Sequence, residues 1–91
     1  MLKKLVIVDD DTPFRERLGR SMEKKGFFVE TFSNYQDCLN RCIDEVFDYA
    51  IIDMRLEDGS GLELIKKLKE ITPNTKCHEG GVGRLVHGTE R

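Results

Sequence analysis

The sequence predicts an α/β fold, a partial doubly wound parallel sheet built from about three β-α units. Three short apolar runs alternate with three segments of helical periodicity. The first of these runs, residues 5–8, is apolar throughout rather than alternating with polar residues, which is typical of a parallel strand covered on both faces. The chain has 91 residues, enough for one domain. We therefore expect parallel strands joined by right-handed crossovers in residues 1–75.

The first unit begins with the apolar run 5–8, which we expect to be a buried strand. Thr12 followed by Pro13 is typical of a helix N-cap and a first helical position, and Asp11 is an alternative N-cap. Gly26 favours a left-handed cap that ends this helix. The helix is expected to carry an apolar stripe at four-residue steps, namely Phe14, Leu18 and Met22.

The second unit combines a strand at 27–32, rich in aromatic and β-branched residues, with a helix. Residues 33–36 fit a capping box that begins with Ser33. The side chains expected to point inward from this helix are Leu39, Cys42, Ile43 and Val46.

The third unit has a strand at 47–52 that runs directly into Asp53. A loop follows at 54–59, and a second capping box at 60–63 opens the third helix. Pro73 cannot continue this helix. Its expected apolar side consists of Leu64, Ile65, Leu68 and Ile71.

Helical and strand periodicity both stop near Asn74. We expect residues 76–91 to form a loose tail, with at most one short strand at 84–87. The third strand would then be an exposed parallel edge, which favours self-association with another chain.

Composition excludes several functional classes. The formal net charge of -2 argues against nucleic-acid binding through a basic surface of this chain. No apolar stretch reaches the length of a membrane span, and the N-terminal apolar run is too short for a signal peptide. We therefore expect a cytoplasmic protein without a membrane partner.

Three cysteines without framework spacing indicate reduced thiols. Cys38 and Cys42 lie four residues apart on the second predicted helix. Metal binding, with His78 or His87 as further ligands, is one interpretation, and packing as small core residues is the favoured one.

Acidic residues follow two of the predicted strands. Asp9, Asp10 and Asp11 come directly after the first strand, and Asp53 ends the third. The carboxyl ends of parallel strands meet at one edge, so these carboxylates are expected to converge there. Mg²⁺ removes the repulsion between such groups, and a carboxylate beside it can attack phosphorus to give an aspartyl phosphate. Helix capping and plain turn roles are the structural alternatives, the latter above all for Asp58.

Two segments resemble the response regulator receiver domains of two-component systems. These are 5–11, Leu-Val-Ile-Val-Asp-Asp-Asp, and 49–56, Tyr-Ala-Ile-Ile-Asp-Met-Arg-Leu, followed by Asp58-Gly59 and Gly61-Leu62. The resemblance covers about residues 1–76 and is greatest to the photosynthetic and redox-responding regulators of proteobacteria. It implies a flavodoxin-like sheet with strand order 2-1-3-4-5.

The resemblance also implies roles for individual residues. Asp53 would accept a phosphoryl group from a phosphohistidine on a sensor histidine kinase. Mg²⁺ would be bound by Asp10 directly, by Asp9 largely through water, by Asp53, and by the backbone carbonyl of Arg55.

The chain departs from the family pattern in two places. Glu57 stands where many members have proline, although the most similar subgroup tolerates it. More seriously, the family continues with a fourth strand ending in Thr or Ser and a fifth ending before a Lys, and nothing after Lys76 matches either. The fourth and fifth units are therefore expected to be missing, as in a truncated or frame-shifted reading of a longer gene.

The leading hypothesis is therefore a signalling module that accepts phosphate on Asp53 and is not an enzyme. One alternative is an inactive receiver fragment without a working switch. Another is an aspartyl-phosphate hydrolase, in which Asp9 and Asp11 form an Asp-x-Asp pair with Asp9 as the nucleophile.

Overall fold

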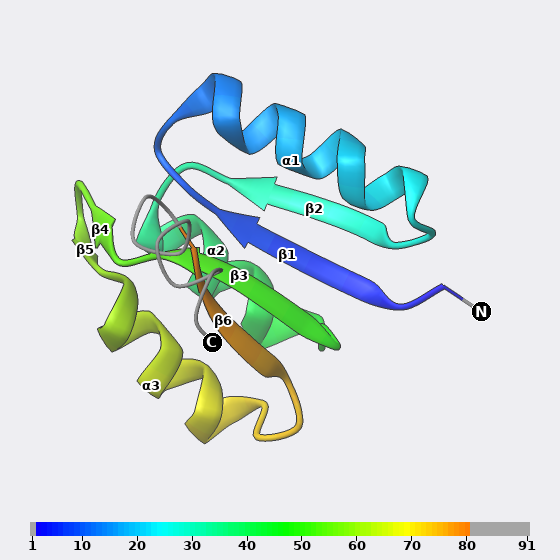
Figure 1. Ribbon diagram of the computed structural model, residues 1–91. Coiled ribbons are helices and arrows are strands. Elements are labelled where there is room, and N and C mark those ends of the chain that lie inside the picture. The colour runs from blue at the N-terminus through cyan, green and yellow to red at the C-terminus, as the bar shows by residue number, and fades with distance from the viewer. Residues whose placement is uncertain (1, 81–91) are drawn as a thin grey trace, which may run out of the picture.

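The structure, a computed structural model, describes residues 2–80, and these residues form the predicted α/β fold (Figure 1). Strands and helices alternate, and a short hairpin is inserted before the last helix. The elements are, in order, β1 (Lys4–Val8), α1 (Thr12–Lys24), β2 (Phe28–Phe32), α2 (Tyr35–Asp44), β3 (Tyr49–Asp53), β4 (Arg55–Leu56), β5 (Gly59–Ser60), α3 (Gly61–Ile71) and β6 (Lys76–Gly80). None of the helices within residues 2–80 has the length and apolar character needed to cross a membrane.

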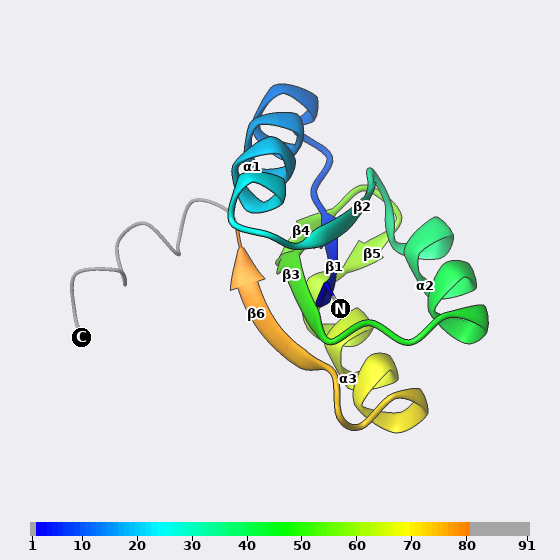
Figure 2. The ribbon, with the colours of Figure 1, turned by 90° about the vertical axis from the view of Figure 1, so that its right-hand side faces the viewer.

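The main sheet contains four parallel strands in the order β2-β1-β3-β6. Figure 2 shows α1 on one face of this sheet and α2 and α3 on the other. The chain winds from β1 to β2 on one side and then returns to β3 on the other side of β1. The carboxyl ends of β1 and β3 therefore meet at a topological switch point, where open α/β sheets place their ligands.

The last strand corrects the sequence analysis, which placed residues 76–91 in a loose tail. Lys76–Gly80 pairs in parallel with Tyr49–Asp53, so β3 is an interior strand of this sheet and a fourth strand is present. The strand predicted at 84–87 lies outside the described residues.

Backbone hydrogen bonds, rather than apolar side chains, hold β6 in place. Three of its five residues are exposed, and Cys77 carries the one apolar side chain of the strand. Just before the strand, the buried hydroxyl of Thr75 donates to the carbonyl oxygen of Phe47 at 2.5 Å. Lys76 N–H then donates to the carbonyl oxygen of Asp48 at 2.9 Å, which starts the ladder with β3.

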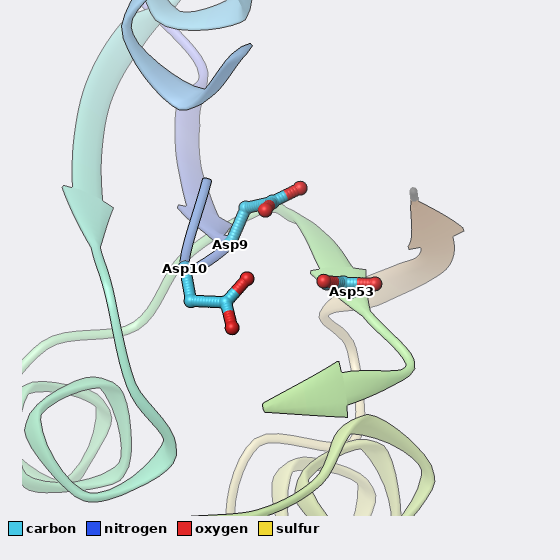
Figure 3. Close-up of side chains that lie close together, drawn as sticks. All are labelled: Asp9, Asp10 and Asp53. Atoms are coloured by element: carbon cyan, nitrogen blue, oxygen red, sulfur yellow. The ribbon is translucent and has the colours of Figure 1, made fainter. Parts of the chain in front are cut away.

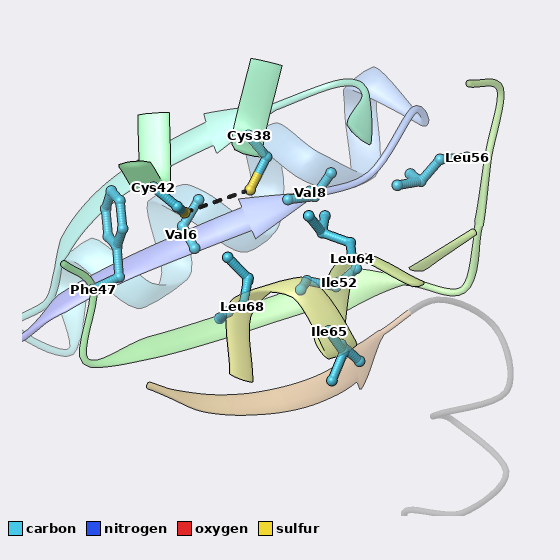
Figure 4. Close-up of a cluster of buried hydrophobic side chains, with 11 residues drawn as sticks. Val6, Val8, Cys38, Cys42, Phe47, Ile52, Leu56, Leu64, Ile65 and Leu68 are labelled. Atoms are coloured by element: carbon cyan, nitrogen blue, oxygen red, sulfur yellow. Dashed lines mark hydrogen bonds between the residues drawn. The ribbon is translucent and has the colours of Figure 1, made fainter. Parts of the chain in front are cut away.

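The hydrophobic core fills the space between the sheet and the two helices α2 and α3 (Figure 4). It contains the predicted α3 residues Leu64, Ile65 and Leu68, whereas Ile71 is 44% exposed. The other buried members are Val6, Val8, Cys38, Cys42, Phe47, Ala50, Ile52 and Leu56.

The inward face of α2 differs from the predicted one. Cys42 is buried as predicted and Leu39 packs against the core, but Ile43 is 67% exposed, because Cys38 and Cys42 occupy the side of the helix that meets the sheet. Val46, which is 63% exposed, lies beyond the end of α2. The two Sγ atoms lie 3.9 Å apart in the core (Figure 4). The interaction with Cys42 and burial both raise the pKa of the Cys38 thiol, which favours its neutral form.

Two of the three predicted helix caps shift by one residue. Asp11, the alternative candidate, is the N-cap of α1 and accepts from Phe14 N–H. Asn34 rather than Ser33 caps α2, and its side chain accepts from Asp37 N–H. The predicted cap of α3 is confirmed, because Ser60 Oγ accepts from the first N–H groups of that helix.

Candidate functional site

Three carboxylates meet at the switch point between β1 and β3. Asp9 and Asp10 follow the last residue of β1, and Asp53 is the last residue of β3. One oxygen from each lies within 4.8 Å of the others. Figure 3 shows the three side chains extending into the same space from the two strand ends. The convergence predicted from the sequence is therefore present, with Asp9 buried, Asp10 exposed and Asp53 half-buried.

Asp9 is only 5% exposed and is held on several sides. Its N–H continues the β1–β2 ladder by donating to the carbonyl oxygen of Phe32 at 3.1 Å. Its Oδ1 accepts from Asp11 N–H at 2.9 Å. Burial is the largest cause that raises the pKa of Asp9 above its ordinary value, and the charges of the neighbouring aspartates raise it further. The metal-free site therefore disfavours ionised Asp9.

Asp53 is fixed by the close approach of α3 to the end of β3. Gly61, the first residue of α3, donates its N–H to the carbonyl oxygen of Met54 at 2.9 Å. A Cβ atom at Gly61 would overlap the carbonyl oxygen of Asp53 and lie 2.8 Å from Met54 Cα. A glycine is therefore required here, and the backbone around Asp53 has little freedom to move.

The hairpin β4–β5 follows Asp53 and carries Arg55, whose backbone carbonyl is the further predicted metal ligand. The sequence analysis treated this segment as a loop with a turn role for Asp58. In the structure the Asp58 carboxylate accepts from the N–H groups of Tyr35 and Gln36, at 2.8 and 3.1 Å. These hydrogen bonds lower the pKa of Asp58 and attach the hairpin to the N-terminus of α2.

The donor set fits a hard divalent cation. Mg²⁺ prefers carboxylate oxygen ligands and keeps several waters, and two or three carboxylates on one edge suit that preference. The raised pKa of Asp9 points the same way, because burial is its largest cause and a cation at this place would offset both that burial and the repulsion from the neighbouring aspartates. Within residues 2–80 this is the single cluster of three acidic, histidine or cysteine side chains with such spacing, so the alternative thiol site finds no support there.

Two contacts were missed by the sequence analysis, one beside the acidic site and one on the hairpin that follows Asp53. The guanidinium of Arg15 on α1 donates to the backbone carbonyl of Asp9 at 2.7 Å. Asp58 reaches α2, as described above. Arginine at this helix position and aspartate in a turn are both common surface choices, so neither gave a sequence signal. Their contacts depend on how α1 and the hairpin fold back toward the site.

Comparisons with known proteins agree on one family. A family model described as the response regulator receiver domain matches residues 5–78. The photosynthetic apparatus regulatory protein RegA of Rhodovulum sulfidophilum is 43% identical over 72 residues, which are 79% of this chain and 39% of that protein. The acid tolerance regulatory protein ActR of Rhizobium meliloti is 40% identical over 74 residues, covering 81% and 38%. The chain thus spans about two fifths of the length of these relatives.

Solved structures show the same fold. A response regulator receiver domain protein (CheY-like) from Methanospirillum hungatei JF-1 superimposes with a TM-score of 0.85 at 29% identity, covering 94% of this chain and 72% of that one. The response regulator TrrA from Thermotoga maritima, determined in complex with Mg²⁺ and BeF, has a TM-score of 0.79 at 25% identity and covers 84% and 66%.

Proposed function

Because the chain belongs to the response regulator receiver domain family, whose members act in phosphorelay signalling, we propose that its acidic site binds Mg²⁺ and that Asp53 accepts a phosphoryl group from a sensor histidine kinase. The observation that carries the proposal is the meeting of Asp9, Asp10 and Asp53 within 4.8 Å at the ends of two adjacent strands. Asp53 is half-buried at the end of β3, and its backbone lies in close contact with Gly61, the first residue of α3.

The proposed transfer needs one nucleophile and a means of neutralising charge. An oxygen of the Asp53 carboxylate forms the new bond to phosphorus, while the bond from phosphorus to the donor imidazole nitrogen breaks and its electron pair stays on that nitrogen. Bound Mg²⁺ supplies neutralisation of the phosphoryl oxygens. Asp10 would bind the ion directly and Asp9 largely through water, and Asp53 and the Arg55 carbonyl complete the proposed protein ligands.

Metal binding also has support from structural neighbours. TrrA was solved with Mg²⁺ and BeF, and a response regulator from Burkholderia pseudomallei was solved with a phosphorylated aspartic acid and a calcium ion. Both are 25% identical to this chain, so for the present chain the ion and its ligands are part of the proposal.

The two alternatives make different demands on the same residues. The hydrolase hypothesis needs Asp9 and Asp11 as a pair, but the Asp11 carboxylate caps α1 by accepting from Phe14 N–H. The hypothesis of an inactive fragment is supported by the last residue of β6, the fourth strand of the sheet. This residue is Gly80, whereas the family pattern has Thr or Ser at the end of the fourth strand. Phosphate acceptance and a complete switch are thus separate questions, and the proposal concerns acceptance. The cytoplasmic location stays a prediction, and so does self-association through an exposed sheet edge, although β3 is not that edge because it pairs with β6.

A labelling experiment tests the proposal. The protein is incubated with Mg²⁺ and a small-molecule phosphodonor, and the acyl phosphate is mapped by mass spectrometry. We expect a mass increase on Asp53 that is lost in Asp53→Asn and on removal of Mg²⁺, but kept in Glu70→Gln, an exposed substitution on α3. A label on Asp9 would favour the hydrolase, and the absence of any label would favour the inactive fragment.

A Mg²⁺ titration monitored by a fold-sensitive signal tests the metal site separately. Saturable binding should be lost in Asp10→Ala and unchanged in Glu70→Gln. If both variants bind as the original protein does, the three carboxylates are not the metal site.

A further inference from the structure

Arg15 bends back from the first turn of α1 over the end of β1. Its Nη1 donates to the backbone carbonyl of Asp9 at 2.7 Å, and its Nη2 donates to Thr12 Oγ1 at 3.4 Å. The side chain is half-buried. Neither of the two ion pairs found in residues 2–80 involves Arg15, and the two hydrogen bonds of its guanidinium go to a backbone carbonyl and a hydroxyl.

The carbonyl that Arg15 binds is one that the sheet leaves without a partner. The β1–β2 ladder ends with Asp9 N–H donating to Phe32 O, and the chain then turns into α1. Because Asp9 is 5% exposed, its carbonyl oxygen needs a hydrogen-bond donor from the protein. A charged guanidinium makes a stronger bond to that oxygen than a neutral donor would.

The peptide plane connects this bond to the metal site. The carbonyl of Asp9 and the N–H of Asp10 belong to one planar unit, so a bond that fixes the carbonyl also fixes where the Asp10 backbone begins. Asp9 is then held at its N–H, its carbonyl and its carboxylate, by Phe32, Arg15 and Asp11. Asp10, by contrast, is exposed and has no side-chain hydrogen bond within residues 2–80.

We propose that Arg15 is a positioning residue of the metal site, which holds the peptide between Asp9 and Asp10 so that the Asp10 carboxylate faces Asp53. Arg15 touches neither the ion nor the phosphoryl group and acts through the Asp9 carbonyl. This inference rests on the proposed function, because it assigns Arg15 to the same site. Residues that hydrogen-bond to metal ligands typically contribute about 10- to 100-fold to metal affinity.

A substitution series separates positioning from plain structural support. Arg15→Met removes both donors and keeps the aliphatic stem, whereas Arg15→Lys keeps a charged donor. Arg17→Met, an exposed arginine on the same helix, is the matched control, and Asp10→Ala reports on the site itself. For each variant the Mg²⁺ dissociation constant and the metal-free urea midpoint are measured at one ionic strength.

We expect Arg15→Met to weaken Mg²⁺ binding about 10-fold, Arg15→Lys to restore a large part of that loss, and Arg17→Met to bind as the original protein does. The loss in affinity should persist when variants with equal urea midpoints are compared, which a merely structural role does not predict. Should Arg15→Met not fold, Arg15→Gln, which keeps an uncharged donor, takes its place with the same expectation.

Equal dissociation constants for Arg15→Met and Arg17→Met would overturn the inference. So would a loss in affinity that Arg15→Lys leaves unrelieved. Asp10→Ala distinguishes a failure of the Arg15 inference from a failure of the proposed metal site. If it abolishes Mg²⁺ binding while the Arg15 variants bind normally, only the role of Arg15 is wrong. If Asp10→Ala binds normally, the proposed metal site is wrong, and the positioning role with it.

Discussion

The two strands that flank β3 differ in how they support its carboxyl end. On the β1 side, Asp9 is buried and bound through its backbone and its side chain. On the β6 side, the residue in register with Asp53 is Gly80, which has no side chain to offer. Both neighbours complete the backbone ladder of β3. The sheet and the acidic cluster are therefore built by different neighbours, because β6 adds backbone hydrogen bonds whereas β1 leads into two of the three clustered carboxylates.

The same comparison extends to the glycines near Asp53. Gly61 lies where an added Cβ would overlap backbone atoms of Asp53 and Met54. At Gly80 an added Cβ would lie 3.0 Å from Cγ2 of Ile51, a half-buried side chain that can adjust. An added Cβ on the α3 side of the site would therefore displace backbone, whereas on the β6 side it would require only a small shift of the Ile51 side chain.

The largest expected effect comes from Gly61→Ala. Since the overlap is with backbone, α3 must move away from β3, and we expect a loss of about 3 kcal/mol in the free energy of unfolding. Gly80→Ala, the matched control, should cost about 1 kcal/mol or less. Urea denaturation monitored by circular dichroism measures both. Equal losses for the two alanine variants would contradict the asymmetry between the two sides.

A second prediction concerns the anchor of β6. Thr75→Val removes the hydroxyl that donates to the Phe47 carbonyl and contacts Thr72 Oγ1, so the buried Phe47 carbonyl loses this donor, whereas Thr72 keeps its bond to the Leu68 carbonyl. We expect a loss of about 2 kcal/mol in the free energy of unfolding, with faster amide exchange in 76–80 than in β1. Thr31→Val, an exposed threonine on β2, is the control and should change stability little. Uniform acceleration of exchange across the sheet would mean that β6 has no separate anchor.

These two regions also show what the sequence could and could not predict. Asp9, Asp10 and Asp53 were found because strand ends are visible as the limits of apolar runs, and parallel strands bring those limits together. β6 was missed because an edge strand in this position needs only a backbone ladder, and a segment with three exposed residues has no apolar pattern. Ile43 was assigned wrongly because periodicity alone did not fix which side of α2 meets the sheet, and Val46 because the helix ends before it.

A third prediction uses the repulsion within the acidic site. Burial and neighbouring charges raise the pKa of Asp9 in the folded protein, so ionised Asp9 destabilises the metal-free fold. Protonated Asp9 therefore contributes stability to the metal-free fold. This contribution is fully present below the ordinary pKa of 3.8 and is lost as the pH rises through the raised pKa. Asp9→Asn keeps an oxygen that can accept from Asp11 N–H but carries no charge. We therefore expect this variant to have a higher metal-free urea midpoint than the original protein at about pH 7.

The Asp9→Asn gain should shrink as the pH falls toward about 4 and should be offset by Mg²⁺, which favours the original carboxylate. Asp44→Asn, an exposed change at the end of α2, serves as the charge control. A midpoint that falls in Asp9→Asn at every pH would mean that the carboxylate stabilises the metal-free fold.

The smallest expected effect belongs to Asp58, which lies away from the acidic cluster but holds its hairpin to α2. Hydrogen bonds from Tyr35 and Gln36 N–H lower its pKa, so the folded state favours the ionised form. That contribution is present above the ordinary pKa of 3.8 and is lost as the pH falls through the lowered value. Asp58→Asn retains one acceptor oxygen and loses the charge. Its urea midpoint should therefore lie slightly below that of the original protein at about pH 7 and approach it at about pH 3.

Glu57→Gln, which removes a charge from the preceding exposed residue of the same turn, separates the hydrogen bonds of Asp58 from general charge effects. If the urea midpoint of Asp58→Asn lies as far below that of the original protein at about pH 3 as at about pH 7, the charge of Asp58 does not contribute to stability. The expected pattern would instead show that the segment following Asp53 is attached to α2 by an ionised carboxylate. In that case the hairpin beside the proposed acceptor is held by charge and hydrogen bonds, whereas β6 on the other side is held by its ladder and by Thr75.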